Sequence, residues 1–214
     1  MKKLILGSSI VVAISALLIG IILKLDTSAR SAISIELVKS LLQVVVIATL
    51  GGVVSLLAQE FNRDREKREA LNDFRKTLLS HLVQIFREAK KARRLLRAKR
   101  DSLQFYDEQM AVINELQLDL ETINEEIKTT KQAFPGEEAQ SRIFTMATYL
   151  NKLVEEYEKN MPKLNRKSPS VSLDQLEYLN DFIGPFRESK FSKEFAHLYN
   201  EALKLMRDVI MGSK

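Results

Sequence analysis

The chain has no cysteine and no tryptophan, and only seven glycines and four prolines occur in its 214 residues. The lack of cysteine excludes disulfides, thiolate nucleophiles and cysteine-ligated metals. The lack of tryptophan means that an aromatic belt at a membrane interface would have to come from Phe61 or be missing. Glycine is too scarce and too isolated for a phosphate-binding loop. Several classes of catalytic site are therefore excluded before any pattern is considered.

Two long uncharged runs lie near the N-terminus. The first covers Leu4–Leu23, and the second covers Ser40–Ala58 with Leu37 and Val38 extending its start. At about 1.5 Å per residue, a helix of this length crosses the hydrocarbon core of a bilayer. We predict a two-helix transmembrane hairpin with spans at about 4–23 and 37–58. A cleaved secretory signal is the alternative for the first run, although its apolar core would be longer than the usual length of about 7–15 residues.

The positions of lysine and arginine predict the orientation of these spans. Lys2 and Lys3 precede the first span, and the connection between the spans carries Lys24 and Arg30. The densest basic cluster follows the second span and consists of Arg63, Arg65, Lys67, Arg68, Arg75 and Lys76. Because positive flanks stay inside, we expect a multi-pass protein of the plasma (inner) membrane with both termini in the cytoplasm.

Small residues recur at helical spacing in both runs. They are Ala16, Gly20, Ala48, Gly51, Gly52 and Ser55. Small residues allow two helix backbones to approach closely in lipid. We predict that they mediate helix packing, either between the two spans of one chain or between protomers. A pore is a further alternative, but only Thr49 and Ser55 offer polar groups near the middle of the second span.

Residues 53–134 contain neither glycine nor proline and are rich in residues that favour helix. Apolar residues recur there every three or four positions, as on one face of a helix. The first such set is Leu71, Phe74, Leu78, Leu82, Ile85, Ala89, Ala92 and Leu96. The second set is Leu103, Tyr106, Met110, Ile113, Leu116, Leu120, Ile123 and Ile127. Each apolar face has to be covered, which predicts packing between helices.

A break near residue 101 is predicted between these two sets. Lys99 and Arg100 suit the last turn of a helix, where cations complement the helix dipole. Asp101 and Gln104 then resemble a capping box that opens the next helix. One continuous helix over residues 60–131 is the alternative.

Further helices are predicted in the last third of the chain. A turn at Phe134–Gly136 precedes a helix that ends before Pro162. Residues 172–175 form a capping box that opens a short helix, and this short helix stops at Gly184. The core-facing residues of the first of these helices are Ala139, Ile143, Ala147, Leu150, Val154 and Tyr157. Those of the last helix are Phe191, Phe195, Leu198, Ala202, Leu205 and Val209.

These patterns together predict an all-α fold in three parts. A two-helix transmembrane hairpin at residues 1–59 is followed by a long helical arm or hairpin at 60–133. Helical segments at 134–214 complete an antiparallel cytoplasmic bundle with coiled-coil-like arms, because the links between the helices are short.

Charge is divided into two adjacent blocks. The basic block consists of Arg87, Lys90, Lys91, Arg93, Arg94, Arg97, Lys99 and Arg100, with Glu88 as its one acid. The acidic block consists of Asp101, Asp107, Glu108, Glu115, Asp119, Glu121, Glu125 and Glu126. If the chain turns near residue 101, the two blocks lie on neighbouring helices, and we expect them to form ion pairs with each other.

An acidic protein partner or an anionic lipid is the alternative ligand of the basic block. Nucleic acid is disfavoured, because this block contains no aromatic side chain for base stacking. The candidate binding residues are Arg87, Lys90, Lys91, Arg94 and Arg97.

Metal and catalytic chemistry find little support in the sequence. Glu194 and His197 have the Glu-x-x-His spacing of di-iron bundles, but no second copy of this motif exists. We interpret His197 with Glu201 as an ordinary helical pair, and His81 as a partly buried packing residue. No metal and no cofactor are expected.

The function predicted from these features is that of a non-enzymatic, membrane-anchored helical scaffold that associates with itself or with another protein. The alternatives are an oligomeric pore or transport-related protein and a sensor of anionic lipid. The predicted partners are therefore the bilayer, a second copy or a protein partner, and anionic lipid.

Overall fold

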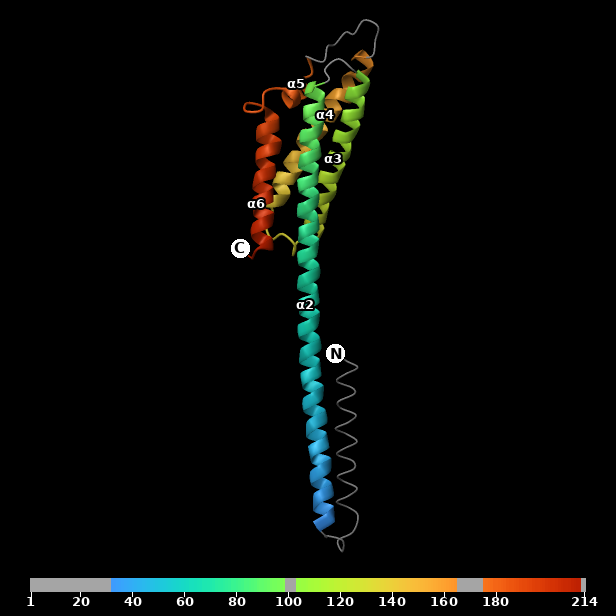
Figure 1. Cartoon of the computed structure of the whole chain (residues 1–214), viewed down its shortest axis with the longest axis vertical. Helices are drawn as coiled ribbons and strands as arrows, with labels where there is room; N and C mark the ends of the chain where they lie inside the picture. Colours follow the sequence, from blue (N-terminus) through green and yellow to red (C-terminus); the bar gives the residue numbers. More distant parts are fainter. Residues whose placement is uncertain (1–31, 99–102, 165–174, 213–214) are drawn as a thin grey trace. The chain divides into compact units, whose positions relative to one another are not determined.

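The computed structural model describes residues 32–98, 103–164 and 175–212 (Figure 1). Within these ranges the chain forms helices and turns and contains no strand. The all-α prediction is therefore confirmed for the described part of the chain. The chain divides into two compact units, which we call unit 1 (residues 1–68) and unit 2 (residues 69–214). The three-part division drawn from the sequence stays a prediction.

Helix α2 (Ala32–Ala98) begins in unit 1 and ends in unit 2. Most of its described large apolar side chains in unit 1 are exposed, and Val45 and Leu56 are half-buried. The exposed ones are Leu42, Val44, Val46, Ile47, Leu50, Val53, Val54, Leu57 and Phe61. Among the described residues, α2 is the one helix that is long and apolar enough to cross a membrane. It starts at Ala32, five residues before the predicted span, because residues 32–36 contain no helix breaker. The other predicted span, at 4–23, lies outside the described residues.

The described residues of unit 2 form the last part of α2 and five further elements. These are α3 (Leu103–Thr129), α4 (Glu138–Leu164), α5 (Glu177–Ile183), the π-helix η2 (Phe191–His197) and α6 (Leu198–Ile210). Figure 1 shows α3, α4 and α6 beside the C-terminal part of α2.

One shared core holds these helices together, and the helical spacing in the sequence identified most of it. The predicted residues buried on α2 are Leu78, Leu82, Ile85, Ala89, Ala92 and Leu96, and Leu71 and Phe74 pack on them half-buried. The predicted residues buried on α3 are Tyr106, Met110, Ile113, Leu116, Leu120, Ile123 and Ile127. All six predicted positions of α4 are also buried. Burial of apolar surface on four helices at once is the dominant stabilising term of unit 2.

Polar contacts between helices show in which direction neighbouring helices run relative to each other. The Tyr157 hydroxyl near the end of α4 donates to Asp107 near the start of α3 at 2.8 Å. Arg142 near the start of α4 donates to Glu201 in α6 at 2.8 Å. His81 on α2 lies 3.6 Å from Asp119 on α3. A short turn joins the end of α3 to the start of α4, and the Tyr157–Asp107 contact joins their other ends. The two helices therefore run in opposite directions.

The structure corrects the predicted end of the fourth helix. α4 continues through Pro162 to Leu164 instead of ending before the proline. Pro162 lies in the last turn, so its missing N–H removes one hydrogen bond near a helix end and none further along. Burial of Leu164 in the core favours the extra turn.

The predicted final helix begins as a π-helix over Phe191–His197 before α6 continues as an α-helix. Its predicted residues Phe191, Phe195 and Ala202 are buried, and Leu198, Leu205 and Val209 are half-buried against the core. The predicted break near residue 101 and the residues of the 172–175 capping box up to Asp174 lie outside the described residues. The short helix α5 ends at Gly184 as predicted.

An aromatic cluster fills the part of the core around η2. The rings of Phe191 and Phe195 stack at 5.3 Å between centroids, and Phe182 meets Phe191 edge-on at 5.2 Å. Phe86 of α2 stacks on Tyr199 of α6 at 3.7 Å. Such pairs add stability beyond the burial of their area.

Replacing Phe195 by alanine should therefore lower the free energy of unfolding by about 3–5 kcal/mol, because a fully buried ring leaves a cavity. Phe144→Ala is the matched control, since the Phe144 side chain is 60% exposed, and its effect should stay within about 0.5 kcal/mol. Denaturant unfolding of the full chain in mild detergent, followed by circular dichroism, measures both. Equal effects of the two substitutions would contradict the proposed core.

Candidate interaction site

The five basic residues selected from the sequence, Arg87, Lys90, Lys91, Arg94 and Arg97, are all exposed on α2. Their spacing places them along one side of the helix, which we call the basic face of α2. Four of them, together with Glu88 and Leu95, line an open depression of about 450 Å³. Arg97 lies one turn further along the same side.

Few of these cations have a partner in the described part of the molecule. Lys91 forms an ion pair with Glu88 at 3.1 Å, and Lys90 lies 5.3 Å from the centre of the Phe86 ring. Arg87, Arg94 and Arg97 form no ion pair with any described residue. The basic face is thus a concentration of positive charge that the described residues leave largely uncompensated.

The predicted ion pairing between the basic and acidic blocks is wrong for the described residues, among which no ion pair joins the two blocks. The reason is the direction in which the two helices point their charges. The core-facing positions of α2 and α3 are apolar, so the charged positions of both helices face outward. The acidic block makes other contacts instead, including those of Asp107 and Asp119 given above.

The small residues proposed for membrane helix packing lie in unit 1. Ala48, Gly51 and Ser55 are exposed on α2, and Gly52 is half-buried. A Cβ atom added at Gly51 or Gly52 would meet no described atom within 4 Å. Ala16 and Gly20 lie outside the described residues, so packing between the spans stays a prediction.

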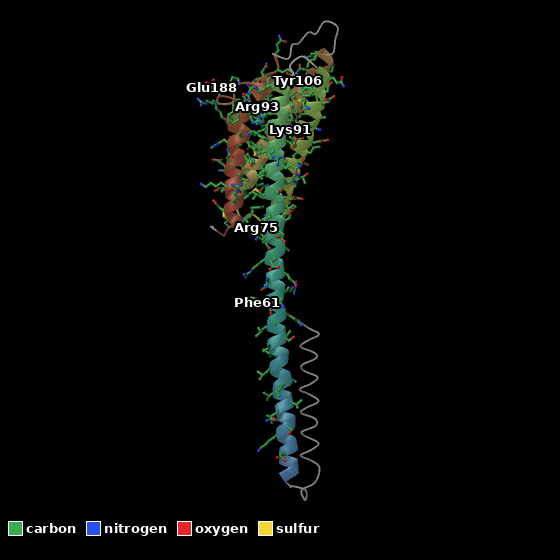
Figure 2. The ribbon with its side chains drawn as sticks, in the orientation of Figure 1. Phe61, Arg75, Lys91, Arg93, Tyr106 and Glu188 are labelled. Atoms are coloured by element: carbon green, nitrogen blue, oxygen red, sulfur yellow. The ribbon has the colours of Figure 1, made fainter. Side chains whose placement is uncertain are left out.

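Arg93 was part of the basic block in the sequence but was not selected as a site residue, and the structure gives it a different role. It is buried, with 7% of its surface exposed, and donates to the carbonyl oxygens of Phe182 at 2.5 Å and Gly184 at 2.6 Å. Its guanidinium also lies 5.2 Å from the Phe191 ring centre. Figure 2 labels Arg93 and the exposed Lys91 on the same helix. Arg93, two positions from the exposed Lys91, therefore binds backbone carbonyls at the end of α5.

Arg75 acts in the same way at the other end of unit 2. Its Nε donates to the carbonyl oxygen of Ala133 at 2.5 Å, and its Nη2 donates to that of Gln132 at 3.0 Å. Both carbonyls lie in the turn that follows α3, outside the hydrogen bonds of the helix itself. Two arginines of α2 therefore satisfy backbone groups at the ends of α3 and α5. The planar guanidinium, with its several donors, suits this pairing better than a lysine.

Asp181 organises the region around Arg93. Its carboxylate accepts the backbone N–H groups of Lys190 at 2.7 Å and Phe191 at 2.9 Å, at the start of η2. It also accepts the Tyr149 hydroxyl at 3.2 Å. This set of contacts joins α4, α5 and η2 around one half-buried carboxylate.

Ionisation of Arg93 and Tyr149 responds to this environment. Burial lowers the pKa of Arg93, and the nearby Arg97 lowers it further. Burial also raises the pKa of Tyr149 well above its ordinary value of 10, with further contributions from Asp181. The fold therefore requires a neutral tyrosine at this position.

A second depression, of about 680 Å³, lies between the end of α3 and the start of α4. Its lining residues include Asn124, Lys131, Gln140 and Phe144. Asn124 is 9% exposed, and its buried Oδ1 has no hydrogen-bond partner among the described residues. Neither the spacing of apolar residues nor the charge pattern in the sequence pointed to this depression.

The histidines form no larger chemical group. His197 lies 3.3 Å from Glu201, which agrees with the predicted helical pair. His81 is half-buried beside Asp119. In the part of the chain that the structure describes, no group of three or more His, Cys, Asp or Glu residues could hold a metal ion.

Comparisons of this chain with protein-family models, curated proteins and solved structures find no match.

Arg93→Lys should lower the free energy of unfolding by about 1–3 kcal/mol, because a lysine cannot satisfy both buried carbonyls in the same plane. Arg94→Lys is the matched control at the adjacent exposed position and should change stability by no more than about 0.5 kcal/mol. Guanidinium unfolding of both variants tests this. The role given to Arg93 is wrong if its substitution is as mild as that of Arg94.

Unit 2 should also lose stability above pH 10. The raised pKa of Tyr149 means that the folded state keeps its proton while the unfolded state releases it, so stability is full below about pH 10 and falls as the pH rises. One such group corresponds to about 1.4 kcal/mol per pH unit. Unfolding free energies measured between pH 9 and 12 should therefore fall less steeply in Tyr149→Phe than in the wild type. If the unfolding free energies of the two proteins fall in parallel between pH 9 and 12, the role given to the buried Tyr149 hydroxyl is wrong.

Proposed function

We propose that this protein is a non-enzymatic scaffold that is anchored in the membrane and associates with itself, presenting unit 2 as an interaction domain. One observation carries the proposal. α2 is a single helix with exposed apolar side chains at residues 42–58 and a buried apolar stripe at residues 78–96. In water the exposed apolar stretch would be strongly unfavourable, whereas in a bilayer it is stable. The same helix thus supplies both a candidate anchor and the foundation of unit 2.

The proposed location is the inner membrane, with two spans and with both termini in the cytoplasm. The dense lysine and arginine cluster at residues 63–76 supports this orientation, since positive residues that flank a span are retained inside. Unit 2 would then act at the cytoplasmic surface, as an antiparallel helical bundle with exposed charged faces.

Self-association has two supports. A Cβ atom added at Gly51 or Gly52 would meet no described atom within 4 Å, and these glycines, with the small residues Ala48 and Ser55, suit close approach of another helix. The basic face of α2 offers a second surface, on which Arg87, Arg94 and Arg97 form no ion pair with a described residue. An anionic lipid headgroup is the alternative ligand for these cations.

A pore is the second candidate function. The polar groups of the span support a pore less well than they support a scaffold. The Thr49 hydroxyl donates to the carbonyl oxygen of Val45 at 2.7 Å, within its own helix. Its hydrogen is therefore not available to line a water-filled path. The polar side chain of Gln43 lies near the beginning of the apolar stretch, far from its middle.

Two differently tagged copies of the full chain should co-purify from mild detergent after expression in the same membrane, because the proposed scaffold binds a second copy. The same preparation in liposomes should give no ionic conductance above that of protein-free liposomes. A tagged membrane protein with unrelated spans controls for trapping in mixed micelles.

Absence of co-purification would contradict self-association. Discrete conductance steps would favour the pore instead.

A further inference from the structure

The depression between the end of α3 and the start of α4 has a buried amide in its lining. Asn124 is 9% exposed, and its Oδ1 is shielded from solvent without a hydrogen-bond partner among the described residues. A buried acceptor without a donor is a costly state. Half a turn about the last side-chain bond exchanges Oδ1 with Nδ2, so the amide can present its acceptor to a ligand. A ligand that brings an N–H group into the depression therefore gains a hydrogen bond there.

The same depression is lined by apolar side chains. Ile127 and Phe134 are buried, whereas the side chain of Phe144 is 60% exposed. An apolar group of a ligand that covers the Phe144 ring removes both surfaces from water, which is favourable. The volume of about 680 Å³ lies within the range of about 300–1,000 Å³ that ligand sites occupy.

The charges around the depression balance each other. Lys128 forms an ion pair with Glu125 at 3.2 Å. Lys131 and Glu137 have opposite signs, and neither forms an ion pair with any described residue. A depression without net charge does not select an anion such as a lipid headgroup, and it suits a neutral polar group. Gln140 adds a second amide, which offers donors and an acceptor as a peptide group does.

A smaller depression of about 120 Å³ adjoins the first one. Phe134 and Gly136 line both depressions, and the smaller one reaches Leu205 and Val209 of α6. Gly136 has a φ of 97°, which favours glycine, and a Cβ atom added there would meet no described atom within 4 Å. The two depressions thus form one elongated surface, which fits an extended chain better than a compact small molecule.

We propose that these two adjoining depressions bind a short, extended peptide segment of a partner protein. The segment places a large apolar side chain against Phe144 and donates a backbone N–H to Asn124. The inference rests on unit 2 being the interaction domain proposed above and names the chemistry of its partner, but it does not depend on self-association. Since a neutral peptide group is recognised, binding should change little with ionic strength.

The absence of cysteine allows a reporter to be placed at the depression. Ser141→Cys, at an exposed lining position, is alkylated with iodoacetamide in the full chain in lipid nanodiscs. The probe is N-acetyl-phenylalanine methylamide, which carries one apolar side chain between two peptide groups. It should slow the alkylation about fivefold at saturation, with half of the effect at about 1 mM, as expected for so small a ligand. The control reporter, Lys204→Cys on the exposed side of α6, should react at an unchanged rate.

Three further substitutions in the reporter chain test the contacts. Asn124→Leu keeps the size of the side chain and removes its acceptor. It should raise the half-effect concentration about tenfold without lowering the free energy of unfolding, because the lost acceptor had no partner. Phe144→Ala should raise the half-effect concentration about tenfold by removing the exposed ring. Leu118→Ala removes a side chain that is 51% exposed outside both depressions, and it should leave that concentration unchanged.

Two changes of the probe test the class of ligand. An analogue with oxygen in place of both N–H groups should require about a tenfold higher concentration, because it has no donor for Asn124. Of two probes extended by one leucine, at the amino or at the carboxyl end, at least one should bind about tenfold more tightly, because it reaches the smaller depression. Free probe concentrations are measured in each case, since these probes also enter lipid.

Equal protection of the Ser141→Cys and Lys204→Cys reporters would overturn the inference. Equal protection by the analogue without N–H groups would indicate a purely apolar site, and no gain from either extension would indicate a small molecule; both results contradict a peptide ligand. A loss of stability in Asn124→Leu with unchanged binding would make Asn124 a structural residue and would also overturn it.

These outcomes are separate from the test of self-association. If tagged copies co-purify but the probe protects neither reporter, the peptide site is wrong and self-association stands. If the probe protects Ser141→Cys but the copies do not co-purify, self-association alone is wrong.

Discussion

Burial of the apolar stripe of α2 from Leu78 to Leu96 is the interaction on which the rest of unit 2 depends. These side chains are at most 2% exposed, and they share one core with α3, α4 and α6. Since the stripe occupies one side of a helix, the exposed charged residues of this part of α2 lie on the other side, and Arg93 is the described exception that is buried. The exposed basic face follows directly from this division.

The same burial positions two arginines where backbone groups need partners. Arg75 donates to carbonyls beyond the end of α3, and Arg93 donates to the carbonyl of Phe182 in the last turn of α5 and to that of Gly184. Each satisfies acceptors that would otherwise be desolvated without a hydrogen bond, which is a costly state. The arginines of α2 thus divide into two kinds: those that stabilise unit 2 and those that remain available at its surface.

The periodic apolar residues predicted most of the helices and the core, because the spacing of buried positions depends mainly on helix geometry. The burial of Arg93 was not predicted, since its neighbours Arg94 and Lys91 have the same charge and only packing distinguishes them. The assignment of Pro162 as a helix end failed because burial of Leu164 outweighs one missing hydrogen bond.

The charge blocks show a second reason why the sequence alone did not predict the site. Their adjacency in the sequence suggested pairing between α2 and α3, yet the apolar stripes decide which sides of the helices meet. Charges that are near in sequence therefore point away from each other. The depression beside Asn124 was also missed, because a turn and two helices create it together and no local pattern records it.

The central claim is that residues 42–58 of α2 cross a bilayer and leave unit 2 on the cytoplasmic side. Single cysteines introduced from Glu36 to Arg63 in this cysteine-free chain, labelled with a membrane-impermeant maleimide, test it most directly. The account predicts labelling of Glu36→Cys from outside only, of Arg63→Cys from inside only, and protection of the positions between 42 and 58. Labelling of both end positions from the same side, or free labelling throughout the stretch, would contradict it.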